Sequence, residues 1–296
     1  KEEPRNEGVL VYVDGALVTK AEAKVSIFDA GFSMGDGVWE GLRLRRGRLL
    51  FLEEHLDRLM AGAAQIRMAG LEREAVALAL RRTLEANAMT DGAHLRLMVT
   101  RGLKTAVNQD PRNAVGRPTI VITAEYKLAP PRPPGWGLRL ATVSVRCPER
   151  SVFDMRLNSH SRLPLILALL EAIDAGADEA LMLDPHGKVS SCNATNFFCV
   201  RGGQVLTSAG AYCFNGVTRA QVIGVCHANS IPLTLASFDP AEARSADEAF
   251  VTGTLGGLTP VRQIDDAILA QCPGPMTSRL RALYEAQKDA DAGAGP

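Results

Sequence analysis

The chain has 296 residues, of which 46% are apolar and 22% are charged, and its formal net charge is zero. This composition is typical of a globular protein and excludes a global electrostatic attraction to nucleic acid or to an anionic membrane. No apolar run reaches the ~18 residues that span a bilayer, and the polar N-terminus does not resemble a secretory signal. The scattered cysteines form no Cys-x-x-Cys pair, so we expect free thiols in a reducing cytoplasm and no metal site.

The first half of the chain alternates hairpin, helix and strand patterns. Asp14-Gly15 separates two short apolar runs, and this pair favours the turn that joins antiparallel strands. Apolar residues later recur at helical spacing, and two apolar runs follow that are typical of buried strands. The predicted elements are hairpins at 9–18 and 44–49, helices at 53–69 and 72–86, and strands at 95–100 and 119–126.

A proline-rich stretch at 129–137 cannot continue a helix or a central strand, and we predict a linker there. It separates a small α/β domain at 1–128 from a larger domain at 138–288. Strand and helix patterns are mixed in both parts without a strict βαβ rhythm, which predicts the α+β (α/β) class. In the larger domain we expect strands at 138–145, 179–183, 196–200 and 204–207 and helices at 165–175 and 218–228. The small, polar tail at 289–296 is predicted to be disordered.

One local pattern is compatible with phosphate binding. Gly216 permits a tight bend just before Thr218, which opens a predicted helix and places free backbone N–H groups at its positive end. Taken alone, the same residues fit an ordinary helix cap at least as well. The turn at 253–257 offers further N–H donors, or is simply a tight loop.

Several segments resemble, in the family's order, the blocks of class IV aminotransferases, the lineage of branched-chain and D-amino-acid aminotransferases and aminodeoxychorismate lyases. These segments are 32–43, 51–59, 176–184, 196–198, 215–219 and 246–254, within a similarity that runs from about Val9 to about Ile264. The resemblance implies a fold-type IV architecture, with a small N-terminal domain, a larger pseudo-barrel domain and pyridoxal 5'-phosphate between them. It also implies a homodimer.

The resemblance assigns roles position by position. For the cofactor phosphate it implies Arg58, the helix start at Val217 and Thr218, and Thr254. For the substrate it implies Trp39 as an aromatic wall, Arg96 near the carboxylate, and Leu255.

Three positions depart from the family pattern. The lysine that forms the Schiff base corresponds to Asn158, and the tyrosine that contacts the ring oxygen corresponds to Arg162. The glutamate that pairs with the pyridine nitrogen corresponds to Ser191. An asparagine amide is neither a nucleophile nor a base at neutral pH, and a serine cannot hold the ring proton by charge. The departures therefore imply that covalent tethering and most of the ring's activation are lost. Lys104 is the least improbable substitute amine.

The replacement residues have a pattern of their own. If the stretch is extended, Asn158, His160 and Arg162 share one face, because side chains alternate along a strand. His160 is then placed to act as an acid or base, and Arg162 to bind a carboxylate or phosphate. Alternatively, these groups only hydrogen-bond one another and fill a dead pocket.

We therefore expect a class IV aminotransferase-like protein that binds pyridoxal or pyridoxamine phosphate non-covalently, with ordinary transamination weak or absent. Its other ligand would be an amino acid, a keto acid or a phosphate compound. Two alternatives stay open. One is a cofactor-independent enzyme that uses His160 and Arg162, and the other is a ligand-binding protein without catalysis.

Overall fold

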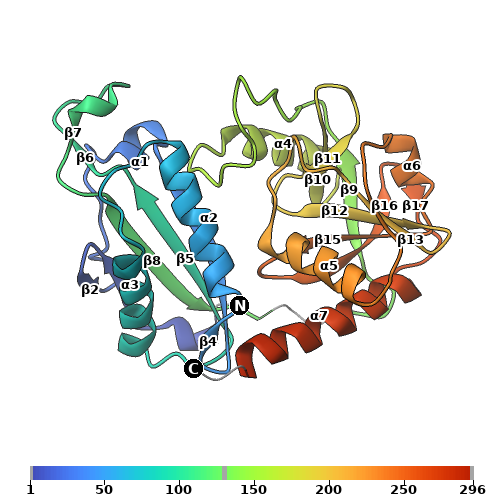
Figure 1. Cartoon of the computed structure of the whole chain (residues 1–296), viewed down its shortest axis with the longest axis horizontal. Coiled ribbons are helices and arrows are strands. Elements are labelled where there is room, and N and C mark those ends of the chain that lie inside the picture. Colours follow the sequence, from blue (N-terminus) through green and yellow to red (C-terminus); the bar gives the residue numbers. More distant parts are fainter. Residues whose placement is uncertain (1–2, 129–131, 294–296) are drawn as a thin grey trace. The chain divides into compact units, whose positions relative to one another are not determined.

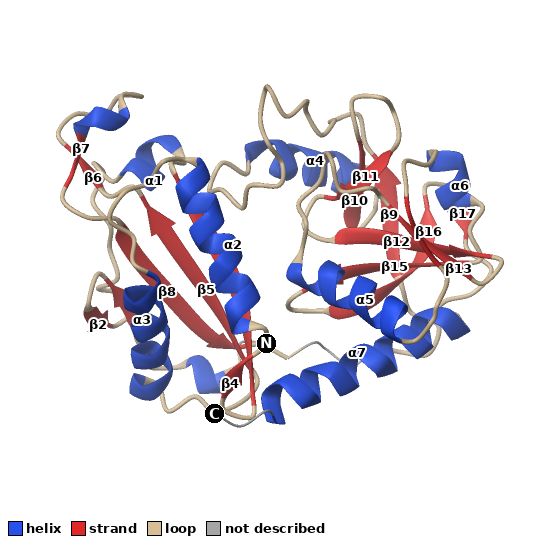
Figure 2. Ribbon diagram, viewed as in Figure 1, coloured by secondary structure: helices blue, strands red, loops and turns tan. Residues whose placement is uncertain are grey.

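The computed structural model describes residues 3–128 and 132–293 (Figure 1). Within these ranges the chain forms two compact units. The first unit holds residues 3–128, 158–161 and 290–293, and the second unit holds residues 132–157 and 162–289. Both units mix helices with sheets, which confirms the predicted α/β class (Figure 2). Residues 129–131 of the predicted linker lie outside the described ranges.

The first unit is built on an antiparallel sheet with the strand order β2-β1-β8-β5-β3-β4. Its strands are β1 (Val11–Val13), β2 (Ala16–Val18), β3 (Gly37–Arg45), β4 (Arg48–Leu49), β5 (Ala93–Thr100) and β8 (Thr119–Tyr126). The smaller elements are η1 (Pro4–Asn6), α1 (Ala30–Met34), η2 (Pro111–Asn113) and the pair β6 (Leu103–Lys104) and β7 (Ala114–Val115). Both predicted hairpins are confirmed. Asp14 and Gly15 take the positive φ values of 47° and 97° that their turn requires.

Two helices pack on this sheet, α2 (Leu52–Gln65) against β3 and α3 (Arg73–Ala86) against β8 (Figure 2). Burial alternates along β5, so Leu95, Leu97 and Val99 are inaccessible, whereas His94 and Arg96 lie on the opposite face. The prediction of a buried strand at 95–100 therefore holds for one face of β5 and is wrong for the other. It is a strand with one apolar face, as is usual in antiparallel sheets.

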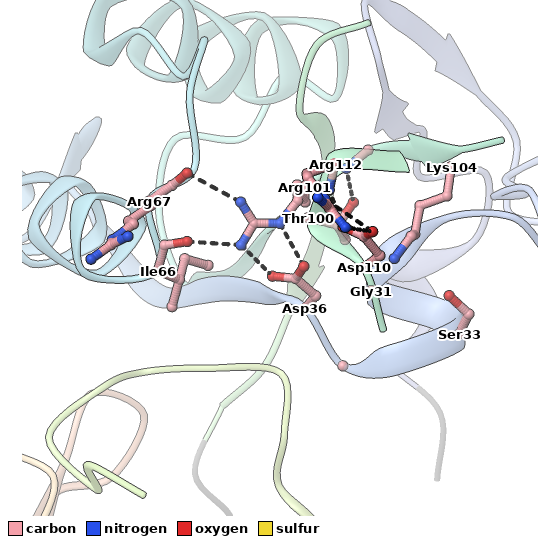
Figure 3. A network of polar contacts seen from close by, with 12 residues as sticks. Gly31, Ser33, Asp36, Ile66, Arg67, Thr100, Arg101, Lys104, Asp110 and Arg112 are labelled. Atoms are coloured by element: carbon pink, nitrogen blue, oxygen red, sulfur yellow. Dashed lines mark hydrogen bonds and ion pairs between the residues drawn. The ribbon is translucent and has the colours of Figure 1, made fainter. Parts of the chain in front are cut away.

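Arg101, just after β5, joins the start of β3 to the end of α2 (Figure 3). Its Nε and Nη2 donate to the Asp36 carboxylate at 2.6 and 3.0 Å. Its Nη2 and Nη1 also donate to the carbonyls of Ile66 (2.8 Å) and Arg67 (3.1 Å), where helical C=O groups lose their internal partners. This network fixes the two elements that carry Trp39 and Arg58.

The second unit is built on a mixed sheet with the order β11-β10-β9-β16-β15-β12-β13-β14, and β17 pairs with β16. Its strands are β9 (Leu138–Thr142), β10 (Glu179–Leu183), β11 (Val189–Cys192), β12 (Asn196–Arg201), β13 (Gln204–Thr207), β14 (Leu233–Leu235), β15 (Glu248–Gly253), β16 (Gly257–Ile264) and β17 (Ala267–Ile268). Its helices are α4 (Leu163–Asp174), α5 (Val217–Ala228), α6 (Pro240–Arg244) and α7 (Pro275–Gly293), of which the last four residues belong to the first unit.

Apolar side chains fill both faces of this sheet. On one face, Ala141, Ala180 and Met182 pack with Ala168 and Ala172 of α4. The opposite face carries a larger cluster around Leu140, Phe197, Val251 and Ile264. Such two-sided burial explains why the strands read as continuous apolar runs in the sequence.

The prediction that the tail at 289–296 is disordered is wrong for residues 289–293. Helix α7 continues through residues 289–293, and residues 294–296 lie outside the described ranges. The Asp291 carboxylate accepts a hydrogen bond from the Phe51 N–H at 2.9 Å, so a residue that the composition assigned to a free tail is anchored. At its start, α7 is capped by the buried Glu248 carboxylate, which accepts from the N–H groups of Met276 (2.9 Å) and Thr277 (2.8 Å).

The cysteines at 147, 192, 199, 213, 226 and 272 form no disulfides in the described residues. Of the helices in residues 3–128 and 132–293, none is long and apolar enough to cross a membrane.

Candidate functional site

Residues 158–161 pair with the edge of β3 in the first unit, although they follow β3 by more than a hundred residues. The Trp39 N–H donates to the Asn158 carbonyl at 3.0 Å, and the His160 N–H donates to the Gly37 carbonyl at 2.9 Å. The Trp39 indole Nε1 adds a hydrogen bond to the Ser159 carbonyl at 3.1 Å. Gly37 permits this approach, because a Cβ there would lie 2.5 Å from both the Val99 carbonyl oxygen and the His160 ring.

Asn158 is buried, and its side chain is engaged in this edge. Its Nδ2 donates to the Trp39 carbonyl oxygen at 2.5 Å. Main chain and side chain of Asn158 therefore both bond to one residue of β3. The amide acts here as a structural hydrogen-bonding group.

The backbones of Asn158 and His160 pair with β3, but that of Arg162 does not. Arg162 is the N-cap of α4, with φ −105° and ψ 5°, and it belongs to the second unit. Pro164 in the first turn of α4 favours helical geometry and ends the extended stretch. The expectation that Asn158, His160 and Arg162 share one strand face is therefore wrong at Arg162, whose guanidinium lies 5.7 Å from the Phe214 ring centroid.

Arg58 of α2 is held by Glu40 of β3, a carboxylate with no exposed surface. Arg58 donates from Nε at 2.8 Å and from Nη2 at 2.6 Å, and the buried His55 ring Nδ1 lies 2.7 Å from the same carboxylate. Burial opposes ionisation of Glu40, but the hydrogen bonds from His55 and Arg58 outweigh it and hold the pKa of that carboxyl below its ordinary value. The result is an oriented guanidinium whose side chain is 19% exposed.

On the opposite face of the sheet, Arg96 of β5 lies over Trp39 of β3, with its guanidinium 3.4 Å from the ring centroid. Burial lowers the pKa of Arg96, and Glu40 partly offsets that shift. Neighbouring His94 has its pKa lowered to about 4, first by burial and then by Arg43, Lys127 and Arg96. Trp39 and Arg96 are thus brought together as a rigid aromatic and cationic pair.

In the second unit, Ser191 is linked to the start of α5 through Asn196. The Ser191 hydroxyl donates to the Thr195 carbonyl at 2.8 Å and lies 3.2 Å from the Asn196 Nδ2, which donates to it. Asn196 also donates to the Phe214 carbonyl at 2.6 Å and accepts from the Gly216 N–H at 3.1 Å. The single hydroxyl proton of Ser191 is therefore donated to a protein acceptor, the Thr195 carbonyl.

Helix α5 begins at Val217 after the N-cap Gly216, which as a glycine has no side chain that could cap the helix. Val217 and Thr218 are buried in the first turn, where N–H groups lack intrahelical acceptors. Asn196 pairs with Thr252 of β15, and the following turn carries Thr254 and the exposed Leu255. Helix α5 packs against β15. Asn196 thus links Ser191 to the start of α5 and pairs with the strand that leads to Thr254.

Other candidates lie elsewhere. Lys104 is buried, and its Nζ donates to the Asn108 carbonyl at 2.5 Å. A hollow of about 620 Å³ in the second unit is lined by Arg201, Glu242 and Asp247 and by none of the sequence-predicted site residues. In the part of the chain that the structure describes, no group of three or more His, Cys, Asp and Glu side chains is arranged to hold a metal ion.

The sequence interpretation missed the supporting residues. Glu40 and Asn196 lie within the family-like segments 32–43 and 196–198, but nothing in their local sequence identifies their hydrogen-bond partners. His55, one turn before Arg58, is a further supporting residue, since its ring Nδ1 contacts the same Glu40 carboxylate.

Comparisons with known proteins identify a family model, relatives and solved structures that this chain resembles. The protein-family model described as "Amino-transferase class IV" matches residues 37–264. The chain is 38% identical over 293 residues to "Branched-chain-amino-acid aminotransferase-like protein 2" of Arabidopsis thaliana, covering 97% of this chain but only 51% of that protein, about half its length. It is 35% identical to a "Putative branched-chain-amino-acid aminotransferase" of Methanocaldococcus jannaschii, covering 93% of this chain and 95% of the relative.

A solved structure shares the fold. The branched-chain aminotransferase from the thermophilic archaeon Thermoproteus uzoniensis, solved with norvaline, superposes with a TM-score of 0.84 at 29% identity, covering 96% of this chain and 95% of that chain.

Proposed function

The chain belongs to the class IV amino-transferase family, and we propose on that basis that it binds pyridoxal phosphate or pyridoxamine phosphate without a covalent bond. The observation that carries the proposal is the first turn of α5, where Gly216 leaves the N–H groups of Val217 and Thr218 without a side-chain cap among the described residues. A helix N-terminus of this kind favours a phosphate dianion. Arg58 and Thr254 are the further phosphate contacts in this proposal.

The chain's residues fit the phosphate end of the cofactor but not its covalent attachment. When bound, such a cofactor supplies a reactive carbon and an electron-withdrawing ring for chemistry on amino acids and keto acids. The neutral Asn158 amide, bonded to the Trp39 carbonyl, is no nucleophile. The Ser191 hydroxyl donates its proton to the Thr195 carbonyl. Because it is neutral, it cannot stabilise a protonated pyridine nitrogen of the cofactor as a carboxylate would. We therefore propose that ordinary transamination is weak or absent.

The second ligand that we propose is a small amino acid or keto acid. Trp39 would form an apolar wall, and the Arg96 guanidinium, 3.4 Å above its ring, would meet a carboxylate. Leu255, exposed on the β15–β16 turn, would add an apolar contact. The names of the relatives point to branched-chain substrates.

We propose a second copy of the chain as the protein partner. Helix α4 exposes apolar side chains at helical spacing, namely Leu163, Ile166, Leu167, Leu170 and Ile173, each 48–64% exposed. A continuous apolar stripe on a helix usually meets a partner surface. Light scattering should give the mass of a dimer for the wild-type chain and of a monomer for Leu170→Glu; a monomeric wild type would remove this part of the proposal.

The test is an absorbance spectrum of the purified protein before and after addition of pyridoxal phosphate, followed by borohydride. Saturable binding with the spectrum of the free aldehyde, and no label after borohydride, would support non-covalent use. A label on a lysine would revive an ordinary aminotransferase with a substitute amine such as Lys104. No binding would overturn the proposal.

The same preparation separates the alternatives. Turnover of a carboxylate or phosphate compound without cofactor, lost in His160→Ala, would favour the cofactor-independent enzyme. Cofactor binding with no turnover of any amino donor or keto acid would favour a ligand-binding protein without catalysis.

A further inference from the structure

Arg219, the third residue of α5, is a buried cation. It is 7% exposed, and no carboxylate lies within ion-pair distance of it in residues 3–128 and 132–293. Its Nη2 donates to the Ser208 carbonyl at 2.7 Å and its Nη1 to the Asn215 Oδ1 at 3.3 Å, whereas its Nε has no partner within the described residues. Burial lowers the pKa of Arg219, but an arginine in a protein stays charged. Buried charges are normally paired, so this one is an exception.

The position of Arg219 in the first turn of α5 adds to the cost of burying its charge. The N-terminal turn of a helix carries a partial positive charge, which favours anions and disfavours cations. Here a full positive charge is added to that turn. The loop before it is shaped around the guanidinium, since a Cβ on Gly210 would lie 2.6 Å from the Asn215 Oδ1 and 3.5 Å from the Arg219 Nη2. Neutral donors would hold the Ser208 carbonyl without the cost of burying a charge.

We infer that Arg219 is a positioning residue whose buried, uncompensated charge makes the start of α5 selective for a phosphate dianion. The inference rests on the proposed function, because it takes Val217 and Thr218 as the groups that touch the phosphate. Arg219 acts through the field and through the loop that it anchors at Ser208 and Asn215. At an effective dielectric constant near 20, one charge several ångströms from a dianion changes its affinity by about tenfold or more.

The experiment compares the dissociation constants of pyridoxal phosphate, inorganic phosphate and pyridoxal, which lacks the phosphate, for the full chain. We expect Arg219→Gln to weaken binding of both phosphate ligands about tenfold or more and to leave pyridoxal unchanged. Arg219→Lys, which keeps the charge, should retain most of the affinity. Arg201→Gln is the matched control, since it removes an exposed arginine of the same unit that is paired with Glu242, and should change nothing.

The outcomes separate this inference from the proposed function. If the wild type binds neither phosphate ligand, the proposed function fails and this inference fails with it. If the wild type binds and Arg219→Gln binds equally well, or loses pyridoxal to the same extent, only the role of Arg219 is overturned.

A second variant covers the case in which Arg219→Gln does not fold. Asn215→Asp has the shape of the native residue and places a carboxylate beside the Arg219 Nη1. The variant also loses the hydrogen bond from the Asn215 Nδ2 to the Gly210 carbonyl (3.2 Å), so the readout is ligand affinity and not the melting temperature. Asn215→Asp should weaken binding of both phosphate ligands and leave pyridoxal unchanged, because its carboxylate compensates the Arg219 charge. Phosphate binding equal to that of the wild type would overturn the inference.

Discussion

The buried Glu40 carboxylate provides a sharp test of how the first unit is held together. It accepts two hydrogen bonds from Arg58, and the His55 ring nitrogen lies 2.7 Å from it. Glu40→Gln keeps the shape but removes the charge, and it leaves a largely buried guanidinium without its counter-ion. Removing one partner of a buried pair costs about 3–5 kcal/mol. Because the glutamine oxygen still accepts one hydrogen bond, we expect the lower end, about 3 kcal/mol.

The assay is urea unfolding, with free energies taken from their linear dependence on urea concentration. Glu53→Gln is the control, because Glu53 pairs with Arg73 at the same distance of 2.6 Å but its side chain is 75% exposed. An exposed pair contributes less than about 1 kcal/mol. Equal losses in the two variants would refute the argument that burial, rather than the pair itself, sets the magnitude.

Three further predictions use other residues. Burial lowers the pKa of His94 to about 4 from 6.5, so its neutral form stabilises the fold above pH 6.5 and that contribution is lost as the pH falls toward 4. The loss should approach about 3 kcal/mol, and His94→Gln should remove this part of the pH dependence of urea unfolding; an unchanged dependence would contradict it. Gly274→Ala should lower the melting temperature by several degrees, because its Cβ would collide with the Glu248 carboxyl that caps α7, whereas Gly224→Ala in the open middle of α5 should be neutral or stabilising. Asn158→Lys should gain a borohydride-trapped label with pyridoxal phosphate that the wild type lacks; a variant that binds the cofactor but gains no label would show that position 158 does not correspond to the family's lysine.

The sequence by itself determined the elements whose signals are local. Asp14-Gly15 and Arg46-Gly47 specify their hairpins, because each pair adopts the positive φ values that the tight turn needs. The apolar spacing of 53–69 and 72–86 predicted α2 and α3 because a helix repeats every 3.6 residues, although α2 ends earlier, at Gln65. Gly216 before Thr218 likewise predicted the start of α5 to within one residue.

Only the tertiary structure decided which distant residues meet. It placed Asn158 and His160 on the edge of β3 and assigned Arg162 to the other unit, because a β-pairing depends on register across the whole chain. It gave Ser191 its partner Asn196. It turned residues 289–293 from a predicted tail into helix, since the Asp291 contact with the Phe51 N–H is invisible to composition. A pattern of a few residues fixes backbone preference, but the partner of a buried charge or amide is a long-range contact and is set only when the sheet closes around it.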